Sequence, residues 1–248
     1  MTDTNQASEV LQGDCLELMK DIPDGSVDMI LADLPYGTTA CKWDTIIPFE
    51  PLWEQYKRII KPNGAIVLTA SQPFTSALVM SNPKMFKYSW IWVKSNVSGF
   101  ANAKKRPLKK YEDVLVFSKL TPPYHPQGLR RLAVPRVRKA KVGDTVGGNG
   151  FYDGYVQQYT NYPINVLEFA NDRKLHPTQK PVALFEYLIK TYTNEGDLVL
   201  DNVAGSGTTG VACQNLNRNF ILMEQEPEYV EIIKQRLELN KERRNDQL

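Results

Sequence analysis

The stretch that decides the fold runs from Leu198 to Glu224 and is LVLDNVAGSGTTGVACQNLNRNFILME. It begins with an apolar strand candidate, Leu198–Asp201, continues through the glycine-rich turn Gly205–Gly210 and a helical segment, and ends in a second strand candidate, Phe220–Glu224. Glycines let the backbone approach a ligand closely, and a strand-terminal carboxylate such as Glu224 is placed to accept hydrogen bonds from two ribose hydroxyls. The stretch therefore predicts an α/β fold with a pocket for a nucleoside-containing ligand.

Strand and helix patterns alternate along most of the remaining chain. Short apolar runs between turn residues predict strands, and amphipathic spacing or a proline at the first turn predicts helices. The strand candidates are Val10–Gln12, Val27–Asp33, Ala65–Ala70, Tyr88–Lys94 and Val114–Ser118, and the helix candidates are Leu52–Ile60, Val182–Ile189 and Tyr229–Leu237. Several strand candidates are almost wholly apolar, as strands covered on both faces are. We therefore predict a doubly wound, mostly parallel sheet of seven strands.

The segment from Leu120 to Arg173 interrupts this alternation. It is rich in Pro, Gly, Tyr, Asn and Arg and has no steady period, so we predict an irregular insertion at residues 120–173. The insertion would separate two halves of one domain, residues 1–119 and 174–248. The polar residues Lys241–Leu248 predict a frayed tail.

Composition fits an ordinary globular protein and excludes a few classes of site and location. The chain has 248 residues, 42% of them hydrophobic, which is enough for one sizeable α/β domain. Its three cysteines, Cys15, Cys41 and Cys213, lie far apart and it has only two histidines, so we predict neither a disulfide framework nor a metal site. The apolar runs are too short to cross a bilayer, and the polar N-terminus does not look like a signal peptide. We expect a cytoplasmic protein with no membrane partner.

A second informative element follows the strand candidate Val27–Asp33. Asp33, Leu34, Pro35 and Tyr36 form a turn at the sheet edge where open α/β sheets bind their ligands. Taken alone, this turn predicts a rigid strand exit about as well as it predicts a catalytic site. Asp33 and the Leu34 carbonyl can, however, accept both N–H groups of an exocyclic base amine, and Tyr36 offers a ring for an extruded base. Together with the glycine turn, the element predicts chemistry on a nucleobase amine.

The glycine turn by itself also fits a nicotinamide dinucleotide. A dinucleotide-binding fold normally opens with such a unit and builds further strands after it, whereas here one strand and one helix remain beyond Gly210. This order argues against an oxidoreductase. A glycine turn that only packs a helix against a strand is the other alternative, and the accompanying acid at Glu224 argues against it.

The order of these motifs resembles that of the β-class amino-methyltransferases of DNA, which act on adenine N6 or cytosine N4. Asp33–Tyr36 is similar to the family's Asp-Pro-Pro-Tyr motif, Asp201–Thr209 to its cofactor loop, and His176–Pro181 to the segment that it uses against the methionine end of the cofactor. The resemblance implies a Rossmann-like methyltransferase sheet, S-adenosylmethionine as methyl donor and double-stranded DNA as substrate. The chain departs from the family pattern at Leu34, where the family has proline, and at Asn202–Ala204, where it has Asp-Pro-Phe.

The resemblance also assigns roles to individual residues. It implies a catalytic turn of Asp33, Leu34, Pro35 and Tyr36, and cofactor contacts by Asp14, Cys15, Lys180, Asp201, Gly205, Ser206, Gly207, Thr208 and Glu224. Within that set Glu224 would bind the ribose, and Lys180 and Thr208 the methionine carboxylate. The acid at Asp33 favours adenine N6, because cytosine N4 members more often have serine there. Cytosine N4 methylation and a catalytically dead DNA-binding relative stay open.

Two blocks of basic residues without intervening acids are candidates for contacts with DNA phosphates. They flank or lie within the insertion, where the family keeps its target recognition region, although such runs are usually solvated faces. The candidates are Lys104, Lys105, Arg106, Lys109, Lys110, Arg130, Arg131, Arg136, Arg138, Lys139 and Lys141. Lys42 and Trp43, which follow the Asp33–Tyr36 turn, are candidates for closing over a flipped base, and an ordinary core position is the alternative for Trp43. The resemblance further implies base flipping, and it allows a homodimer and a restriction-modification partner.

The insertion also holds candidates for reading bases. Arg, Asn and Gln side chains form specific hydrogen bonds with base edges, and the unranked candidates are Asn149, Gln157, Gln158 and Asn161. The same segment has the tyrosines Tyr152, Tyr155, Tyr159 and Tyr162. For these four we expect local packing and not stacking on bases.

Overall fold

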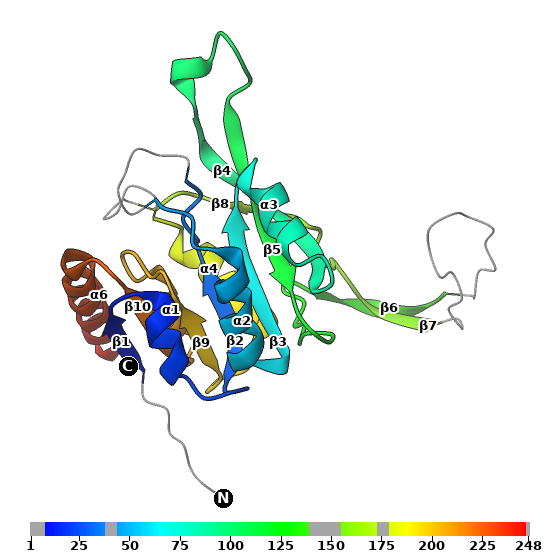
Figure 1. Ribbon diagram of the computed structural model, residues 1–248. Helices are drawn as coiled ribbons and strands as arrows, with labels where there is room; N and C mark the ends of the chain where they lie inside the picture. The colour runs from blue at the N-terminus through cyan, green and yellow to red at the C-terminus, as the bar shows by residue number, and fades with distance from the viewer. Residues whose placement is uncertain (1–7, 38–43, 139–154, 173–178, 247–248) are drawn as a thin grey trace, which may run out of the picture. The chain divides into compact units, whose positions relative to one another are not determined.

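The core of the protein is one mixed sheet with helices on both faces (Figure 1). The computed structural model describes residues 8–37, 44–138, 155–172 and 179–246. In spatial order the sheet contains β1 (Glu9–Gln12), β10 (Asn219–Glu224), β9 (Leu198–Asp201), β2 (Val27–Ala32), β3 (Ile60–Ala70), β5 (Lys109–Phe117), β4 (Phe86–Ser98) and β8 (Val166–Phe169). Only β5 is antiparallel to its neighbours in this sheet. The predicted doubly wound, mostly parallel fold is confirmed.

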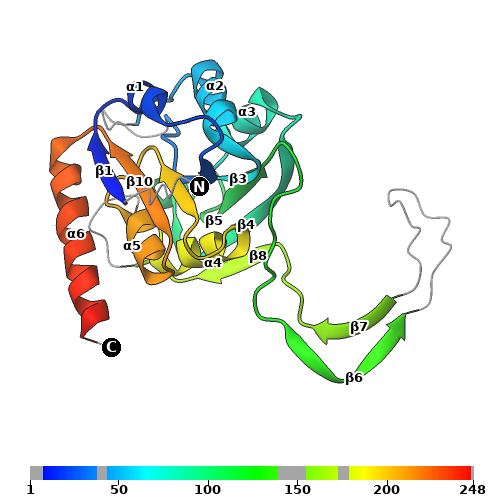
Figure 2. The same ribbon diagram turned by 90° about the horizontal axis from the view of Figure 1, so that it is seen from below.

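In the described part of the chain, six helices cover the sheet, three on each face (Figure 2). One face has α1 (Cys15–Leu18), α2 (Phe49–Ile59) and α3 (Phe74–Ser81), and the other has α4 (Val182–Tyr192), α5 (Thr208–Asn215) and α6 (Pro227–Asn245). Because side chains alternate along a strand, Ile30 of β2 packs into the first of two hydrophobic cores, while Met29 and Leu31 pack into the second. Burial on both faces explains why β2 is apolar except at Asp28.

The N-terminal strand completes the sheet beside the C-terminal strand. β1 pairs in parallel with β10, and the pair Gln12↔Glu224 lies at the end of this ladder. The ladder is extended by the Gly13 N–H, which donates to the Glu224 carbonyl over 3.0 Å. Asp14 follows and caps α1, because its carboxylate accepts the Leu16 N–H over 2.8 Å. Residues 9–14 are thereby held beside β10 and Glu224.

The two halves predicted on either side of the insertion meet at β2 and β9. These strands are parallel, with Met29↔Val199 and Ile30↔Leu200 in register. Asp28 fixes this junction, since one carboxylate oxygen accepts the Leu198 N–H over 3.0 Å and the other binds the Lys61 ammonium over 2.6 Å. Parallel strands in register end at the same edge, so the turn after β2 and the turn after β9 emerge side by side.

The segment 120–173 differs from the predicted irregular structure at three strands. β8 adds an eighth strand to the predicted seven, while β6 (Arg130–Arg138) and β7 (Tyr155–Thr160) form a separate two-stranded antiparallel sheet. The chain divides into one unit of residues 1–125 and 165–248 and a second unit of residues 126–164. A ribbon exposed on both faces needs no apolar alternation, which is why the pattern of the sequence did not indicate β6 and β7.

Two smaller expectations were wrong. α6 continues to Asn245 instead of fraying from Lys241, and Arg244 hydrogen-bonds the Asn217 side chain over 2.7 Å. The expected packing of the insertion tyrosines is contradicted for Tyr155, Tyr159 and Tyr162, which are all exposed, while Tyr152 lies outside the described residues. No helix in the described part of the chain has both the length and the apolar character needed to cross a membrane.

Candidate active site

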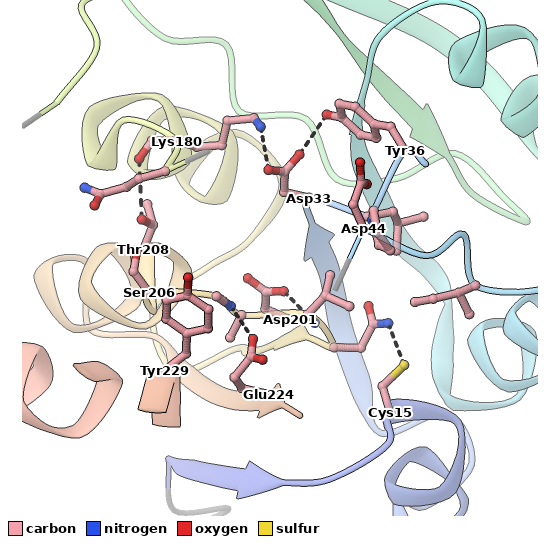
Figure 3. Close-up of a pocket in the computed structure, with 18 of the residues that line it drawn as sticks. Cys15, Asp33, Tyr36, Asp44, Lys180, Asp201, Ser206, Thr208, Glu224 and Tyr229 are labelled. Carbon is pink, nitrogen blue, oxygen red and sulfur yellow. Dashed lines mark hydrogen bonds and ion pairs between the residues drawn. The ribbon is translucent and has the colours of Figure 1, made fainter. Parts of the chain in front are cut away.

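A cavity of about 770 Å³ lies where the turns after β2 and β9 emerge (Figure 3). Its lining includes nearly all the residues that the sequence singled out for catalysis and cofactor contact: Asp14, Cys15, Asp33, Leu34, Pro35, Tyr36, Lys180, Asp201, Gly205, Ser206, Thr208 and Glu224. Gly207 is not among the lining residues. It precedes α5 with a φ of 79°, and an added Cβ would lie 3.1 Å from Ile233, so glycine is required there by packing and backbone conformation.

Asp33 is the centre of a cluster of hydrogen bonds on the β2 side of the cavity. The Tyr36 hydroxyl donates to Oδ1 over 2.7 Å, the Thr69 hydroxyl at the end of β3 donates to the same oxygen, and the Lys180 ammonium contacts Oδ2 over 2.5 Å. The Tyr36 ring in turn stacks on Phe74, with centroids 5.2 Å apart. These contacts fix both the carboxylate and the tyrosine. Figure 3 shows the two that Asp33 makes with Tyr36 and Lys180.

Four charged side chains form a continuous chain beside this cluster. Glu112 of β5 lies 3.1 Å from the Lys94 ammonium through one oxygen and 3.3 Å from the Lys180 ammonium through the other. Two cations therefore alternate with two anions, Glu112 and Asp33, and their formal charges cancel. The Glu112 Oε2 atom is buried and makes no hydrogen bond within the described residues, because its contact with Lys180 lacks hydrogen-bond geometry.

The environment sets the charge state of Lys180 and Tyr36. Burial lowers the pKa of the Lys180 ammonium, which is only 6% exposed, but the nearby carboxylates of Asp33 and Glu112 more than offset this and leave the pKa raised. Burial, together with Asp33 and Glu112, raises the pKa of the Tyr36 phenol well above its usual value. At neutral pH the site therefore contains a lysine cation and a neutral tyrosine that donates to Asp33.

The glycine loop and Glu224 form the β9–β10 side of the cavity. One Glu224 oxygen accepts the Gly205 N–H over 2.8 Å, and the other accepts the Glu226 N–H over 2.9 Å. Burial raises the pKa of Glu224, against the effect of the backbone N–H groups. Gly205 has a φ of 53° and only open space where a Cβ would lie. A carboxylate has about four acceptor positions, and these two hydrogen bonds use one on each oxygen. Glu224 can therefore accept hydrogen bonds from the hydroxyl groups of a ligand beside the Gly205 backbone.

Comparison with known proteins identifies the family. Residues 27–235 match the model of the N6/N4 DNA methylases. This chain belongs to the N6/N4 DNA methylase family. It is 32% identical to the DNA adenine methyltransferase YhdJ of Escherichia coli K12, over 95% of this chain and 84% of YhdJ. It is 31% identical to the type II methyltransferase M.HpaI of Haemophilus parainfluenzae, over 90% of this chain and 72% of M.HpaI.

A solved structure agrees with this membership. The crystal structure of the M1.HpyAVI–SAM complex aligns with a TM-score of 0.63 at 28% identity, and the alignment covers 92% of this chain and 99% of the other. The resemblance to the N6/N4 DNA methylases that the motifs indicated is thus confirmed. The roles of individual residues are not decided by the match, and they remain predictions.

This N6/N4 DNA methylase accommodates its two departures from the family motifs. The Leu34 side chain is buried in the hydrophobic core beneath the catalytic turn. Asn202 accepts a hydrogen bond from the Tyr56 hydroxyl over 2.6 Å, and its amide nitrogen lies 3.4 Å from the Cys15 sulfur. Leu34 is therefore held by packing, and Asn202 by hydrogen bonds, at the wall of the cavity.

Three residues that contact Asp33 or Lys180, directly or through Glu112, were not predicted. Thr69 lies at the end of β3, at the same sheet edge as Asp33. Because open α/β sheets bind their ligands at the carboxyl ends of the strands, this position was a usable signal. Lys94 and Glu112 had no such signal, because they come from β4 and β5 and meet Lys180 only in the fold. Lys180 lines the cavity as expected, but its ammonium is bound to Asp33 and Glu112, so a contact with the methionine carboxylate stays a prediction.

The basic candidates for DNA contact lie on different parts of the methylase. Lys104, Lys105, Arg106, Lys109 and Lys110 are exposed near the end of the β4–β5 hairpin, and Arg130, Arg131 and Arg136 are exposed on β6 in the second unit. Arg138 pairs with Tyr155 in the β6–β7 ladder. Lys42, Trp43, Lys139, Lys141 and Asn149 lie outside the described residues.

Among residues that the structure describes, no group of three His, Cys, Asp or Glu side chains is arranged to hold a metal ion.

Asp201 at the end of β9 gives a pH-dependent prediction. Burial raises the pKa of its carboxyl from 3.8 to about 7, against the lowering effect of the Thr209 hydroxyl and the Val203 N–H. The folded protein holds this proton more tightly than the unfolded chain does. The stability from Asp201 is therefore complete below the unfolded pKa and is lost as the pH rises through about 7.

We expect the free energy of unfolding of the wild type to fall, between about pH 5 and about pH 7, by roughly 2 kcal/mol more than that of Asp201→Asn. Urea unfolding at several pH values measures this difference. Parallel pH dependence of the two proteins would contradict the shifted pKa.

Proposed function

We propose that this protein transfers a methyl group from S-adenosylmethionine to adenine N6 in double-stranded DNA. The observation that carries the proposal is that the Asp33–Tyr36 turn and the Gly205–Glu224 pocket line one cavity. The relative YhdJ is a DNA adenine methyltransferase, and the aligned M1.HpyAVI structure contains S-adenosylmethionine (SAM). Both agree with a nucleoside pocket beside an amine-binding carboxylate.

The residues on the β9–β10 side fit the nucleoside part of S-adenosylmethionine. Glu224 presents acceptors for the two ribose hydroxyls, and Gly205 leaves the backbone open beside them. Asp14 and Cys15 line the same cavity and are our candidates for the adenine end. When bound, S-adenosylmethionine supplies a methyl group on a sulfonium. The task left to the protein is to bring the target amine to that group.

Asp33 is placed to bind and activate the target amine. The lone pair of an exocyclic amine is delocalised into the base, and accepting the amine N–H groups at Asp33 and the Leu34 carbonyl localises it. Asp33 already accepts from Tyr36, Thr69 and Lys180, so the amine takes a remaining acceptor position or displaces a hydroxyl. Lys180 holds the carboxylate in place through its contact with Oδ2. The negative charge of Asp33 then stabilises positive charge as it develops on the amine.

The target base must leave the duplex to reach this carboxylate. Extruding a base costs a few kcal/mol of stacking and pairing, and stacking on an aromatic ring offsets part of that cost. Tyr36 supplies a ring at the catalytic turn, and we propose that the extruded base stacks on it. We further propose residues 120–173 as the target recognition region between the halves 1–119 and 174–248, and a homodimer as the assembled form.

A methyl-transfer assay tests the proposed function. The protein is incubated with plasmid DNA and S-adenosylmethionine labelled at the methyl group, and the DNA is digested to nucleosides. We expect label in N6-methyldeoxyadenosine. Label in N4-methyldeoxycytidine would favour the cytosine alternative, which the acid at Asp33 disfavours. Cofactor binding without any labelled DNA would instead favour a DNA-binding protein with an inactive site.

Glu224→Gln tests the cofactor pocket. The amide keeps the size of the side chain but replaces an acceptor oxygen by a donor, so we expect the Kd for S-adenosylmethionine to rise about tenfold or more. Calorimetric titration measures it, and the exposed Glu228→Gln on α6 is the matched control. In thermal unfolding, S-adenosylmethionine should stabilise the wild type whereas NAD and NADP should not. Equal affinities of the two variants would contradict the role of Glu224.

A further inference from the structure

The β4–β5 hairpin extends past the rest of the sheet as a two-stranded arm (Figure 1). Its last paired residues are Ser98 and Lys109, so the tip consists of residues 99–108. A 3-10 turn, η2 (Phe100–Asn102), begins the tip, and the Phe100 side chain is 68% exposed. A single exposed hydrophobic side chain is common on protein surfaces, so what Phe100 could contact has to be judged from the order and the charge of its surroundings.

The tip is ordered by its own hydrogen bonds. Gly99 has a φ of 94° and accepts the Asn102 N–H over 2.9 Å. The Asn102 carbonyl then accepts the Lys105 N–H over 2.8 Å and the Arg106 N–H over 3.0 Å. Consecutive turns of this kind hold Phe100 in a defined place instead of leaving it on an unstructured loop.

The charge around Phe100 indicates the partner. Residues 99–110 include Lys104, Lys105, Arg106, Lys109 and Lys110 and no acidic residue, and all five cations are exposed. Such a surface repels a second copy of itself and attracts the phosphates of a nucleic acid. An exposed aromatic ring at the same end of the hairpin as five exposed cations fits DNA better than it fits a protein.

The paired part of the arm, up to its last pair, forms part of the wall of the active-site cavity. Ser98 and Lys109, the last pair of the ladder, line the cavity together with Lys94 and Glu112 lower on the same strands. Phe100 is two residues beyond Ser98, so their Cα atoms are separated by at most about 7 Å. A duplex that brings one base to Asp33 therefore also passes close to Phe100.

We propose that Phe100 is a wedge that inserts into the DNA stack beside the target base and stabilises its extruded state. Proteins that distort DNA insert apolar side chains between base steps in this way, with cations on the neighbouring phosphates. The proposal rests on the proposed function, because it assumes that the cavity receives a base from duplex DNA. It assigns Phe100 a positioning role, whereas Asp33 and Tyr36 contact the base itself.

The test compares two duplexes that share the target site, once that site has been mapped with the wild-type protein. In one duplex the target base is paired, and in the other it faces an abasic position, so that extrusion no longer requires breaking a base pair. We expect Phe100→Ala to lower kcat/KM on the paired duplex about 10- to 100-fold, but less than about threefold on the abasic one. Phe100→Trp, which keeps a large ring, should retain most of the activity on both duplexes.

Met80→Ala is the matched control, because Met80 on α3 is 71% exposed and lies outside the cavity lining. It should behave as wild type on both duplexes. Two results for Phe100→Ala would overturn the wedge directly: an equal loss of activity on the two duplexes, or no loss on either. A different oligomeric mass of Phe100→Ala and wild type in solution would also overturn it, because Phe100 would then serve self-association. A wild-type protein that methylates neither duplex nor any other DNA would overturn the proposed function itself.

Discussion

Replacing Asp33 by alanine should lower the rate of methyl transfer at least about a thousandfold, because it removes the acceptor that localises the amine lone pair and stabilises the developing charge. The Kd for S-adenosylmethionine should change by less than about threefold, since Glu224 and the Gly205 turn lie on the other side of the cavity. Single-turnover rates and calorimetric titration of the same preparation give the two quantities.

Two variants control for the loss of charge. Asp33→Asn keeps the shape of the side chain but not its charge, and it should be almost as inactive as the alanine variant. Asp24→Ala removes an exposed carboxylate that binds Arg58 away from the cavity, and it should keep full activity. An Asp33→Ala protein that transfers methyl groups at the wild-type rate would refute the role assigned to this carboxylate.

Lys180→Met should destabilise the protein by about 3 kcal/mol, because it leaves two partly buried carboxylates without their shared cation. Asp33 and Glu112 would then face each other, with only Lys94 left to compensate Glu112. Activity should fall as well, since Asp33 loses the contact that holds its Oδ2 atom in place. Urea unfolding measures the change in stability. The exposed Lys234→Met on α6, which breaks only an ion pair with Glu231, should cost less than about 1 kcal/mol.

The double variant Lys180→Met, Glu112→Gln isolates the electrostatic part of this effect. Removing the second buried charge should restore part of the stability lost in Lys180→Met, although Asp33 stays without its cation. If Lys180→Met were no less stable than Lys234→Met, or if the double variant were simply the sum of its parts, the charges would not be coupled as the distances indicate.

The fold was largely predictable because its strands are apolar on both faces. β2, β9 and β10 are short apolar runs that end in turn residues, and burial against two helical layers is what produces that pattern. β8 was not predictable in this way. It has four residues, of which only Leu167 is buried, and its pairing with β4 comes from the tertiary structure. β6 and β7 are exposed on both faces, so their sequences show no alternation of apolar and polar residues.

The site was predictable where its chemistry is local in sequence. Asp33 and Tyr36 belong to one turn, and Gly205 and Glu224 to one strand–turn–helix–strand unit, so each group lies within one short stretch of sequence and the two together indicated the site. The chain of charges through Lys94, Glu112 and Lys180 joins three separate segments. Glu112 in particular follows a basic, exposed stretch and gives no sign of being buried between two lysines.

The central claim is that the catalytic turn and the nucleoside pocket serve one reaction in one cavity. A crystal structure of the protein with bound S-adenosylmethionine tests this most directly. We expect the ribose hydroxyls at Glu224 and the methyl group directed at the Asp33–Tyr36 turn, leaving room for an amine within about 3 to 3.5 Å of the methyl carbon. Density that places the cofactor outside this cavity, or with its methyl group directed away from Asp33, would contradict the account.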